Sequence, residues 1–316
     1  MNTQKFKKTF KKLRPYLTAL FIGLVGYLVY ESLSEVSWVE VKSALLKVSI
    51  PTVLVCSALA LMNYFILSSY DYLGFRYLKI SDINVKKIYP SAFISYAFNL
   101  NLGALVGGLG FRYRIYSGWG VDKSKIPLIM LFSTLSNWLG YTAIISFILF
   151  FRTKEIQDLI SLPSWSIYLC GAFSLGVSLG YMALCLTRYE LNIKKIHFKF
   201  PEFKLALTQL ILSMAQWLIV SGIIFLLLQS FEASISYEQV LFTAMIASIA
   251  GVLTHVPAGL GVLEAVFLRM NFDISSSLIL VALLSYRFVY YLLPLFIAIP
   301  SYLSLEYFQK KDNRSK

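Results

Sequence analysis

Long apolar stretches separated by short charged loops dominate the chain. Two further apolar stretches, 88–110 and 238–268, are each interrupted by a cluster of glycines. The pattern predicts an all-α polytopic membrane protein with about six full transmembrane helices and two interrupted segments. The uninterrupted stretches long enough to cross a bilayer lie at about 15–32, 50–69, 127–151, 163–186, 204–229 and 275–305.

The first interrupted segment is the most unusual part of the sequence. Asparagine and arginine are costly in hydrocarbon, and glycine weakens a helix. Non-helical backbone at membrane depth is tolerated only where protein buries it or where it lines a wet cavity. We therefore predict a broken, re-entrant hairpin at a polar site. The residues that carry this prediction are Asn99, Asn101, Gly103, Gly107, Gly108, Gly110, Arg112 and Arg114.

The second interrupted segment contains a weaker copy of the same cluster. Between His255 and Glu264 it holds Pro257, Gly259 and Gly261. These residues predict a second re-entrant break, for the same reason as in the first segment.

A single offset relates the two breaks. The tripeptides that begin at Gly108 and at Gly259 have the same sequence and lie 151 positions apart. The same shift carries three earlier apolar stretches onto later ones, and the loop charges give the copies opposite senses. We interpret the chain as one integral membrane domain, a probable inverted repeat with halves of roughly 1–155 and 156–316. In transporters built this way, the site lies at the bilayer midplane.

Lysine and arginine in the loops predict the topology. Two consecutive basic loops, 70–87 and 111–126, both indicate the cytoplasmic side, so 88–110 has to enter the membrane and return. Both termini are also basic, which places them in the cytoplasm. The loops 31–49, 152–162 and 230–237 are poor in basic residues and are expected outside.

Composition supports an inner-membrane protein. Of the 316 residues, 58% are hydrophobic and only 14% are charged, against about 25% charged in ordinary globular domains. The net charge of +13 is explained by lysines beside the spans, which attract anionic lipid heads, and not by nucleic acid. Three cysteines without paired spacing and two histidines predict neither a metal site nor a cofactor.

Four charged or titratable residues in apolar surroundings are candidates for function. Arg112 and Arg114 either anchor the chain at the interface or hold a lipid phosphate with their planar forks. Glu264 is expected to form an ion pair with Arg112, Arg114 or Arg287, or else to meet a cationic head group or a proton. Arg287 lies 12 residues into an apolar run, which favours a role inside the bundle.

Other polar residues receive simpler interpretations. His255 is satisfied by a local carbonyl or serves as a proton relay. Interhelical hydrogen bonding is the default for the polar or amphipathic residues in or near spans, and small glycines can also permit close helix contact. These residues are Asn63, Asp71, Asn137, Trp138, Gln209 and Gln216.

The sequence resembles the membrane domain of the lysylphosphatidylglycerol synthase/flippase family. The resemblance rests on three segments, Asn99–Gly120, Val256–Glu264 and Tyr286–Pro294. It implies a helical bundle with re-entrant segments that moves an aminoacylated phospholipid between leaflets. Bifunctional members add a soluble domain that transfers lysine from charged tRNA. We expect that domain to be missing, because the chain ends soon after the last span.

Three functional hypotheses follow. The first is a lipid translocator whose ligand is an anionic or aminoacylated phospholipid or a lipid-linked precursor. The second is a membrane enzyme acting on a phospholipid or polyprenyl-phosphate, with His255 and Glu264 as the available groups. The third is a non-transporting partner of a lipid-modifying enzyme; a homodimer is a further alternative. For the first, the expected substrate-binding residues are Asn99, Asn101, Arg112, Arg114, His255, Glu264, Tyr286 and Arg287.

Overall fold

A computed structural model provides the structure of the chain. It describes residues 39, 43, 48–160, 162–193, 196–231, 234–254, 256, 259–270 and 272–314. The predicted first span, 15–32, lies outside the described residues. Within them, most residues belong to helices and the two strands form one short hairpin, which confirms the all-α class.

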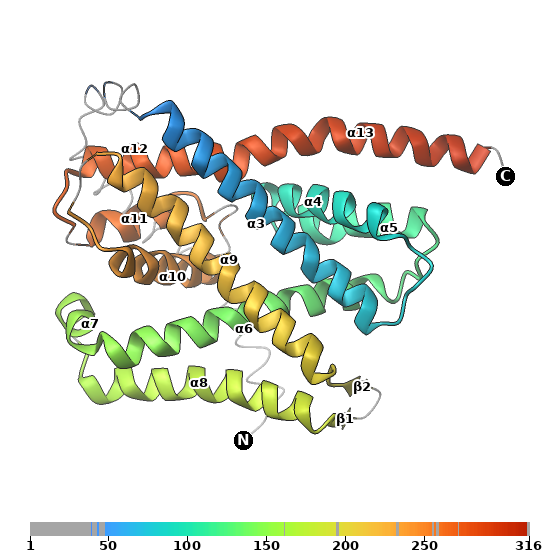
Figure 1. Ribbon diagram of the computed structural model, residues 1–316, viewed down its shortest axis with the longest axis horizontal. Coiled ribbons are helices and arrows are strands. Elements are labelled where there is room, and N and C mark those ends of the chain that lie inside the picture. The colour runs from blue at the N-terminus through green and yellow to red at the C-terminus, as the bar shows by residue number, and fades with distance from the viewer. Residues whose placement is uncertain are drawn as a thin grey trace, which may run out of the picture. The chain divides into compact units, whose positions relative to one another are not determined.

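Figure 1 shows the elements and their order along the chain. Two short segments, η1 and η3, are π-helices, which are wider than α-helices. The elements are α3 (Ile50–Tyr77), α4 (Val85–Leu102), η1 (Ala104–Gly110), α5 (Phe111–Gly118), α6 (Ile126–Phe151), α7 (Thr153–Ile160), α8 (Ser164–Leu186), β1 (Glu190–Ile193), β2 (Ile196–Lys199), α9 (Phe203–Gln229), α10 (Tyr237–Thr254), α11 (Val262–Arg269), α12 (Ser276–Arg287), η3 (Phe288–Leu292) and α13 (Leu293–Arg314).

Six helical segments of the described chain are long and apolar enough to cross a membrane, judged by length and composition. Five of them, α3, α6, α8, α9 and the continuous Ser276–Tyr307, confirm predicted spans. The sixth is α10, which lies inside the interrupted stretch 238–268. Its 18 residues correspond to about 27 Å, close to the thickness of the hydrocarbon layer. That this stretch dips into the membrane instead of crossing it remains a prediction.

Helix α3 is longer than the sequence pattern indicates. The apolar run ends near residue 69, yet the helix continues to Tyr77 and shortens the following loop to 78–84. The added turns contain Asp71, whose side chain is fully buried. A buried carboxylate inside a spanning helix requires a counterion, which the site described below contains.

The described residues fall into two compact units. One draws on Met1–Thr52 and Ile224–Ser285, and the other on Val53–Ile223 and Tyr286–Lys316. Each unit takes residues from both predicted halves, so the units do not coincide with the predicted repeat. Helices α4, α5 and α6 lie wholly within the second unit.

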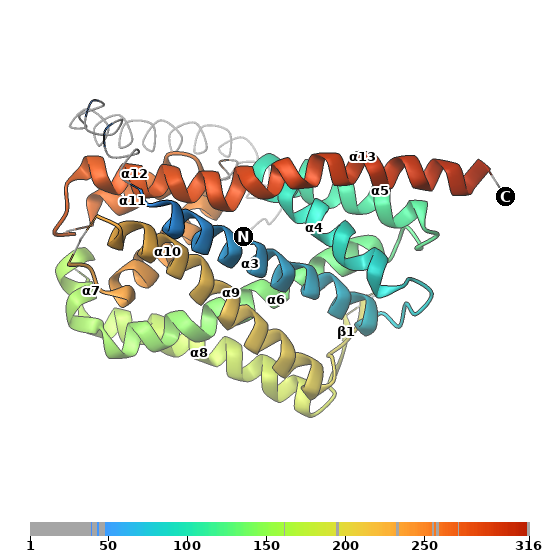
Figure 2. The same ribbon diagram turned by 45° about the horizontal axis from the view of Figure 1, so that its top comes forward.

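The first interrupted segment forms a hairpin within the second unit. Helix α4 is followed by Gly103, whose φ of 84° is accessible mainly to glycine. After this residue the chain turns back, and both η1 and α5 pack against α4. The two ends of the hairpin meet, because the Lys87 ammonium lies 5.7 Å from the centre of the Trp119 ring. Figures 1 and 2 both show α4 and α5 side by side. The segment therefore turns back on itself, as the loop charges predict.

The second interrupted segment repeats this order of elements. Helices α4 and α10 both contain 18 residues, and α5 and α11 both contain eight. Their first residues differ by nearly the same offset, 152 (85 and 237) for the long pair and 151 (111 and 262) for the short pair. Glycines with positive φ interrupt both copies, at Gly103 in one and at Gly259 and Gly261 in the other. Element order thus supports the repeat, while opposite membrane orientation remains a prediction.

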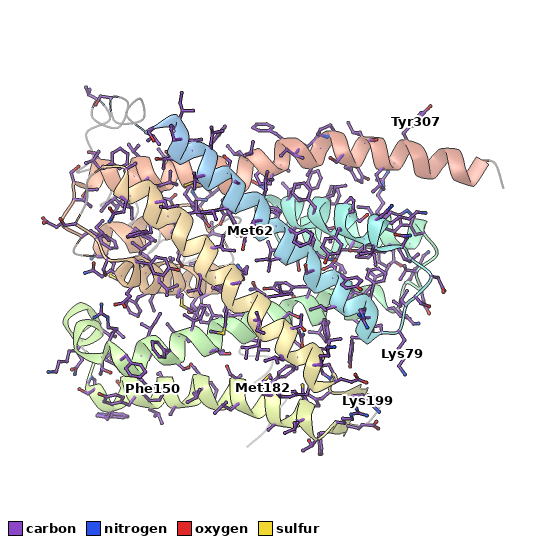
Figure 3. All side chains as sticks on the ribbon, in the orientation of Figure 1. Met62, Lys79, Phe150, Met182, Lys199 and Tyr307 are labelled. Atoms are coloured by element: carbon purple, nitrogen blue, oxygen red, sulfur yellow. The ribbon has the colours of Figure 1, made fainter. Side chains whose placement is uncertain are left out.

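Two loops expected on the same side of the membrane lie at one end of the second unit. The Tyr77 hydroxyl, at the end of α3, donates a 2.5 Å hydrogen bond to the Lys199 carbonyl in the antiparallel β1–β2 hairpin. Figure 3 shows Lys79 and Lys199 at that same end. The basic loops 78–84 and 187–202 therefore share a side, as expected if both are cytoplasmic.

Replacing Gly107 by alanine should destabilise the protein by at least about 1–3 kcal/mol. A Cβ atom there would lie 2.0 Å from the Phe98 carbonyl oxygen, which belongs to the backbone of α4 and cannot move aside. Thermal unfolding of the purified protein in detergent measures the effect. Gly176→Ala is the matched control, because no atom lies within 4 Å of its added Cβ. Equal unfolding temperatures for both variants would contradict the close packing of η1 on α4.

Candidate functional site

A buried ion pair between Arg112 and Asp71 lies at the centre of the second unit. Arg112 Nε and Nη2 donate to the two carboxylate oxygens of Asp71, at 2.7 and 3.0 Å. The Tyr116 hydroxyl and the Ser133 hydroxyl donate to the same oxygens, at 2.6 and 2.8 Å. Asp71, on α3, thus accepts four hydrogen bonds from two other helices, α5 and α6.

The remaining face of Arg112 is occupied as well. Its Nη1 donates to the Gly108 carbonyl at 3.3 Å, and its guanidinium lies 4.4 Å from the centre of the Tyr96 ring. Arg112 is only 1% exposed. A lipid phosphate could reach this fork only by displacing Asp71. The contacts therefore assign Arg112 to holding the hairpin against α3, a role that differs from both interpretations based on the sequence.

Asp71 is the residue whose importance sequence reasoning missed. The sequence pattern alone places it among several polar residues that make interhelical hydrogen bonds. The signal was present, because a carboxylate inside an apolar helix is as costly as an arginine there. What the sequence does not contain is the pairing, since 41 positions separate the two partners.

The glycines after Asn99 allow η1 to lie directly on α4. A Cβ atom added to Gly108 would lie 2.6 Å from the Asn99 Oδ1 atom. A Cβ atom added to Gly107 would likewise collide with the backbone of Phe98. Phe98 and Phe111 stack across the hairpin with ring centres 3.9 Å apart. These contacts support the interpretation of Gly107 and Gly108 as sites of close approach, whereas the α-helix itself is interrupted at Gly103.

The last span also contains a widened turn, and it begins directly after Arg287. In η3 the Leu293 N–H donates to the Phe288 carbonyl, five residues earlier. Pro294 follows and has no N–H to offer the Tyr290 carbonyl four residues before it. The Tyr64 hydroxyl of α3 supplies the missing donor at 3.1 Å. The proline therefore explains why the helix widens here, and π-turns of this kind are frequent at functional sites.

This widened turn contacts the broken hairpin. The Asn101 amide, one residue before the last residue of α4, donates to the Tyr291 carbonyl at 3.2 Å. Arg287 is partly exposed, and its guanidinium lies 5.7 Å from the centre of the Tyr291 ring. Tyr286 stacks on Tyr290 with ring centres 5.3 Å apart. The structure thus brings together three of the predicted site residues, Asn101, Tyr286 and Arg287.

Arg114 lies elsewhere in the second unit. Its exposed side chain forms an ion pair with Glu306 of α13, and the hydrogen bond to that carboxylate raises the pKa of Arg114. Glu306 is 19 positions beyond Arg287 along a continuous helical segment, which corresponds to more than about 20 Å. These contacts do not support one phosphate held by Arg112, Arg114 and Arg287 together. Arg114 is too distant, and the fork of Arg112 is already paired.

The second break belongs to the other unit. Gly261 adopts the left-handed conformation with φ 77° and begins α11, whose first turn contains Glu264. Glu264 is 8% exposed, and a carboxylate in the first turn of a helix is stabilised by the helix dipole. His255 and Pro257 lie outside the described residues, so their predicted roles remain predictions.

These features define a class: an all-helical polytopic membrane protein in which a glycine-broken hairpin is fixed by a buried ion pair. The chain belongs to the family described as the lysylphosphatidylglycerol synthase TM region, whose model matches residues 16–298.

Similar proteins agree with this assignment. The inner membrane protein YbhN of Escherichia coli (strain K12) is 35% identical over 299 residues, which cover 93% of each chain. An uncharacterized protein of Synechocystis sp. is 32% identical over 261 residues, covering 81% of this chain and 80% of the relative. The phosphatidylglycerol lysyltransferase of Staphylococcus haemolyticus is 24% identical over 90% of this chain, but that match covers only 33% of the enzyme.

Removing one partner of the buried ion pair should be far worse than removing both. Asp71→Leu or Arg112→Met alone leaves an uncompensated buried charge and should cost about 3–5 kcal/mol, whereas the double variant should recover much of the loss. A double-mutant cycle on thermal unfolding in detergent measures this coupling.

The matched control is Arg114→Met, which removes an exposed ion pair and should change the unfolding temperature little. If the two single variants at the buried pair behaved like this control, Asp71 and Arg112 would not form the structural clamp described above.

Proposed function

We propose that the protein is a lipid translocator of the inner membrane, which moves a phospholipid or lipid-linked head group between leaflets. The observation that carries the proposal is Arg287. It is a permanently charged residue inside the most deeply buried of the spanning segments, at the start of a widened turn that contacts the broken hairpin.

The cost of such a charge supports a functional role. An arginine near the centre of a spanning helix costs at least about 2.5–3.5 kcal/mol, and such residues usually mark substrate or ion pathways. Unlike Arg112, which is almost completely buried, Arg287 is partly exposed. Guanidinium pairs with phosphate through two parallel hydrogen bonds, which suits it to a phospholipid head group.

The surroundings of Arg287 suit a lipid head group that passes without being bound tightly. Tyr286 and Tyr291 combine aromatic faces with hydroxyl groups, so they can contact both polar and apolar parts of a lipid. Asn101 connects the turn to the hairpin through a backbone carbonyl. A displacement of the hairpin would therefore also displace the turn that follows Arg287. This contact offers a physical route for coupling lipid binding to a movement of the hairpin.

Arg112 and Arg114 have different roles in this proposal. Arg112 fixes the hairpin and does not contact the lipid. Arg114, exposed beside Glu306 and near the basic loops, would collect anionic head groups at the membrane surface by exchanging its carboxylate partner for a phosphate. Glu264 belongs to the other unit, and its proposed contact with a cationic head group concerns that unit by itself.

The lipid class is proposed from chemistry and from the family together. The arginines favour an anionic phosphate, and the basic loops concentrate anionic lipids near the protein. A relative named phosphatidylglycerol lysyltransferase makes phosphatidylglycerol and its aminoacylated form the first lipids to test.

Arg287→Ala should lower the rate of lipid movement about ten- to hundredfold, the effect of losing a hydrogen-bonded charged contact. The measurement uses the purified protein in vesicles that contain labelled phosphatidylglycerol, with the label in the outer leaflet destroyed chemically. Arg287→Lys keeps the charge but not the fork and should retain partial activity.

Arg76→Ala is the control, since Arg76 lies in the exposed last turn of α3, away from the widened turn. Equal rates for the wild-type protein, the Arg287→Ala variant and the control would remove Arg287 from the proposed pathway. Absence of protein-dependent lipid movement in the wild type would overturn the proposed function itself.

A further inference from the structure

Two neighbouring residues of α3 hold the same residue of the widened turn η3. The Asn63 amide donates a 2.5 Å hydrogen bond to the Tyr290 hydroxyl, and the Tyr64 hydroxyl donates a 3.1 Å hydrogen bond to the Tyr290 carbonyl. Asn63 and Tyr64 are completely buried, and Tyr290 is only 4% exposed. Helix α3 therefore fixes Tyr290 at its side chain and at its backbone.

The backbone contact replaces a hydrogen bond that Pro294 prevents. In a regular α-helix the Tyr290 carbonyl would accept from the N–H of residue 294, which proline lacks. Pro294 by itself permits two outcomes, a kinked α-helix and a widened π-turn. A change from one to the other would move the backbone of Tyr290, which the two hydrogen bonds from α3 oppose. The contacts from α3 therefore favour the widened turn over the kinked helix.

The ring of Tyr64 is held between the turn and the broken hairpin. Its centre lies 5.3 Å from the ring centre of Phe93, on α4, and 5.7 Å from that of Tyr290. A buried ring packed on both sides has few alternative rotamers, so its hydroxyl is held in one direction. Tyr64 thus links the hairpin to the turn through side-chain packing.

Fixing Tyr290 also fixes the neighbours of Arg287. Tyr290 stacks on Tyr286 with ring centres 5.3 Å apart and meets Tyr291 edge to face at 5.5 Å. The Arg287 guanidinium lies 5.7 Å from the centre of the Tyr291 ring, and Arg287 directly precedes η3. A π-turn contains more residues than an α-turn, so straightening it would rotate Arg287 about the helix axis relative to α13.

We propose that Tyr64 is a positioning residue whose hydroxyl, and not Pro294 alone, keeps the turn after Arg287 widened. By holding the turn, it sets the direction of the Arg287 guanidinium beside Tyr291. The consequence for lipid movement rests on the proposed function, whereas the effect of Tyr64 on the turn does not.

The test first removes the hydroxyl. Tyr64→Phe keeps the packed ring but leaves the Tyr290 carbonyl without its donor. Deuterium exchange of the backbone amides of residues 288–293, measured by mass spectrometry on the purified protein in detergent, should become about tenfold faster, the effect of losing one hydrogen bond. The rate of lipid movement in vesicles should fall by about the same factor.

The second step supplies a different donor. Adding Pro294→Ala to Tyr64→Phe gives the Tyr290 carbonyl an N–H from its own helix. Amide exchange should then be as slow as in the wild type or slower, because a regular α-helix can form. Lipid movement should stay slow, because the turn is no longer widened. If Tyr64 only stabilised the fold, both measurements would recover together.

Tyr72→Phe is the matched control and should change neither rate. Tyr72 lies about two turns later on α3, and its hydroxyl makes no hydrogen bond to any residue that the structure describes. Unchanged amide exchange in Tyr64→Phe, or recovery of lipid movement in the double variant, would overturn the positioning role. If the wild-type protein moved no lipid, the proposed function would fail, and amide exchange would still decide whether Tyr64 holds the turn.

Discussion

The buried pair of Asp71 and Arg112 is the interaction on which the rest of the second unit depends. It joins α3 to the first residues of α5, and through Ser133 it also includes α6. A hairpin that contains four glycines has little helical stability of its own. The pair compensates by fixing the point where the hairpin returns, while the Gly107 contact brings η1 onto α4. Bidentate contact with Arg112 and a hydrogen bond from Tyr116 partly compensate the desolvation of the buried carboxylate.

Two departures from regular α-helix occur in this unit, and they have different causes. In η1 the cause is glycine, which permits close packing and a positive φ at Gly103. In η3 the cause is Pro294, which deprives the Tyr290 carbonyl of its usual donor and leaves it to Tyr64. Asn101, near the end of α4, donates a hydrogen bond to the Tyr291 carbonyl of η3. Membrane proteins tolerate such irregular backbone where neighbouring side chains satisfy the freed groups, and here α3 and α4 provide them.

The surroundings of each charged residue near the hairpin, and not its spacing in the sequence, therefore decide its role. Arg112 and Arg114 are two positions apart, yet one is buried against a carboxylate and the other is exposed beside Glu306. Residues two positions apart on a helix point to different sides, so these two arginines do not form one site. Arg287 combines a charge inside a spanning segment with partial exposure, which is why the proposed lipid site is centred on it.

The sequence by itself determined five of the long apolar helices and the places where the two interrupted segments break, because hydrophobic length and glycine clusters act locally. It also indicated that 88–110 turns back, through the basic loops on either side. Only the tertiary structure decided which charged residues form the buried ion pair, since the packing of α3 against the hairpin brings Asp71 and Arg112 together. The same holds for Asn63 and Tyr290, whose side chains form a hydrogen bond although 227 positions separate them. Such contacts join residues far apart in the chain, and no local pattern encodes them.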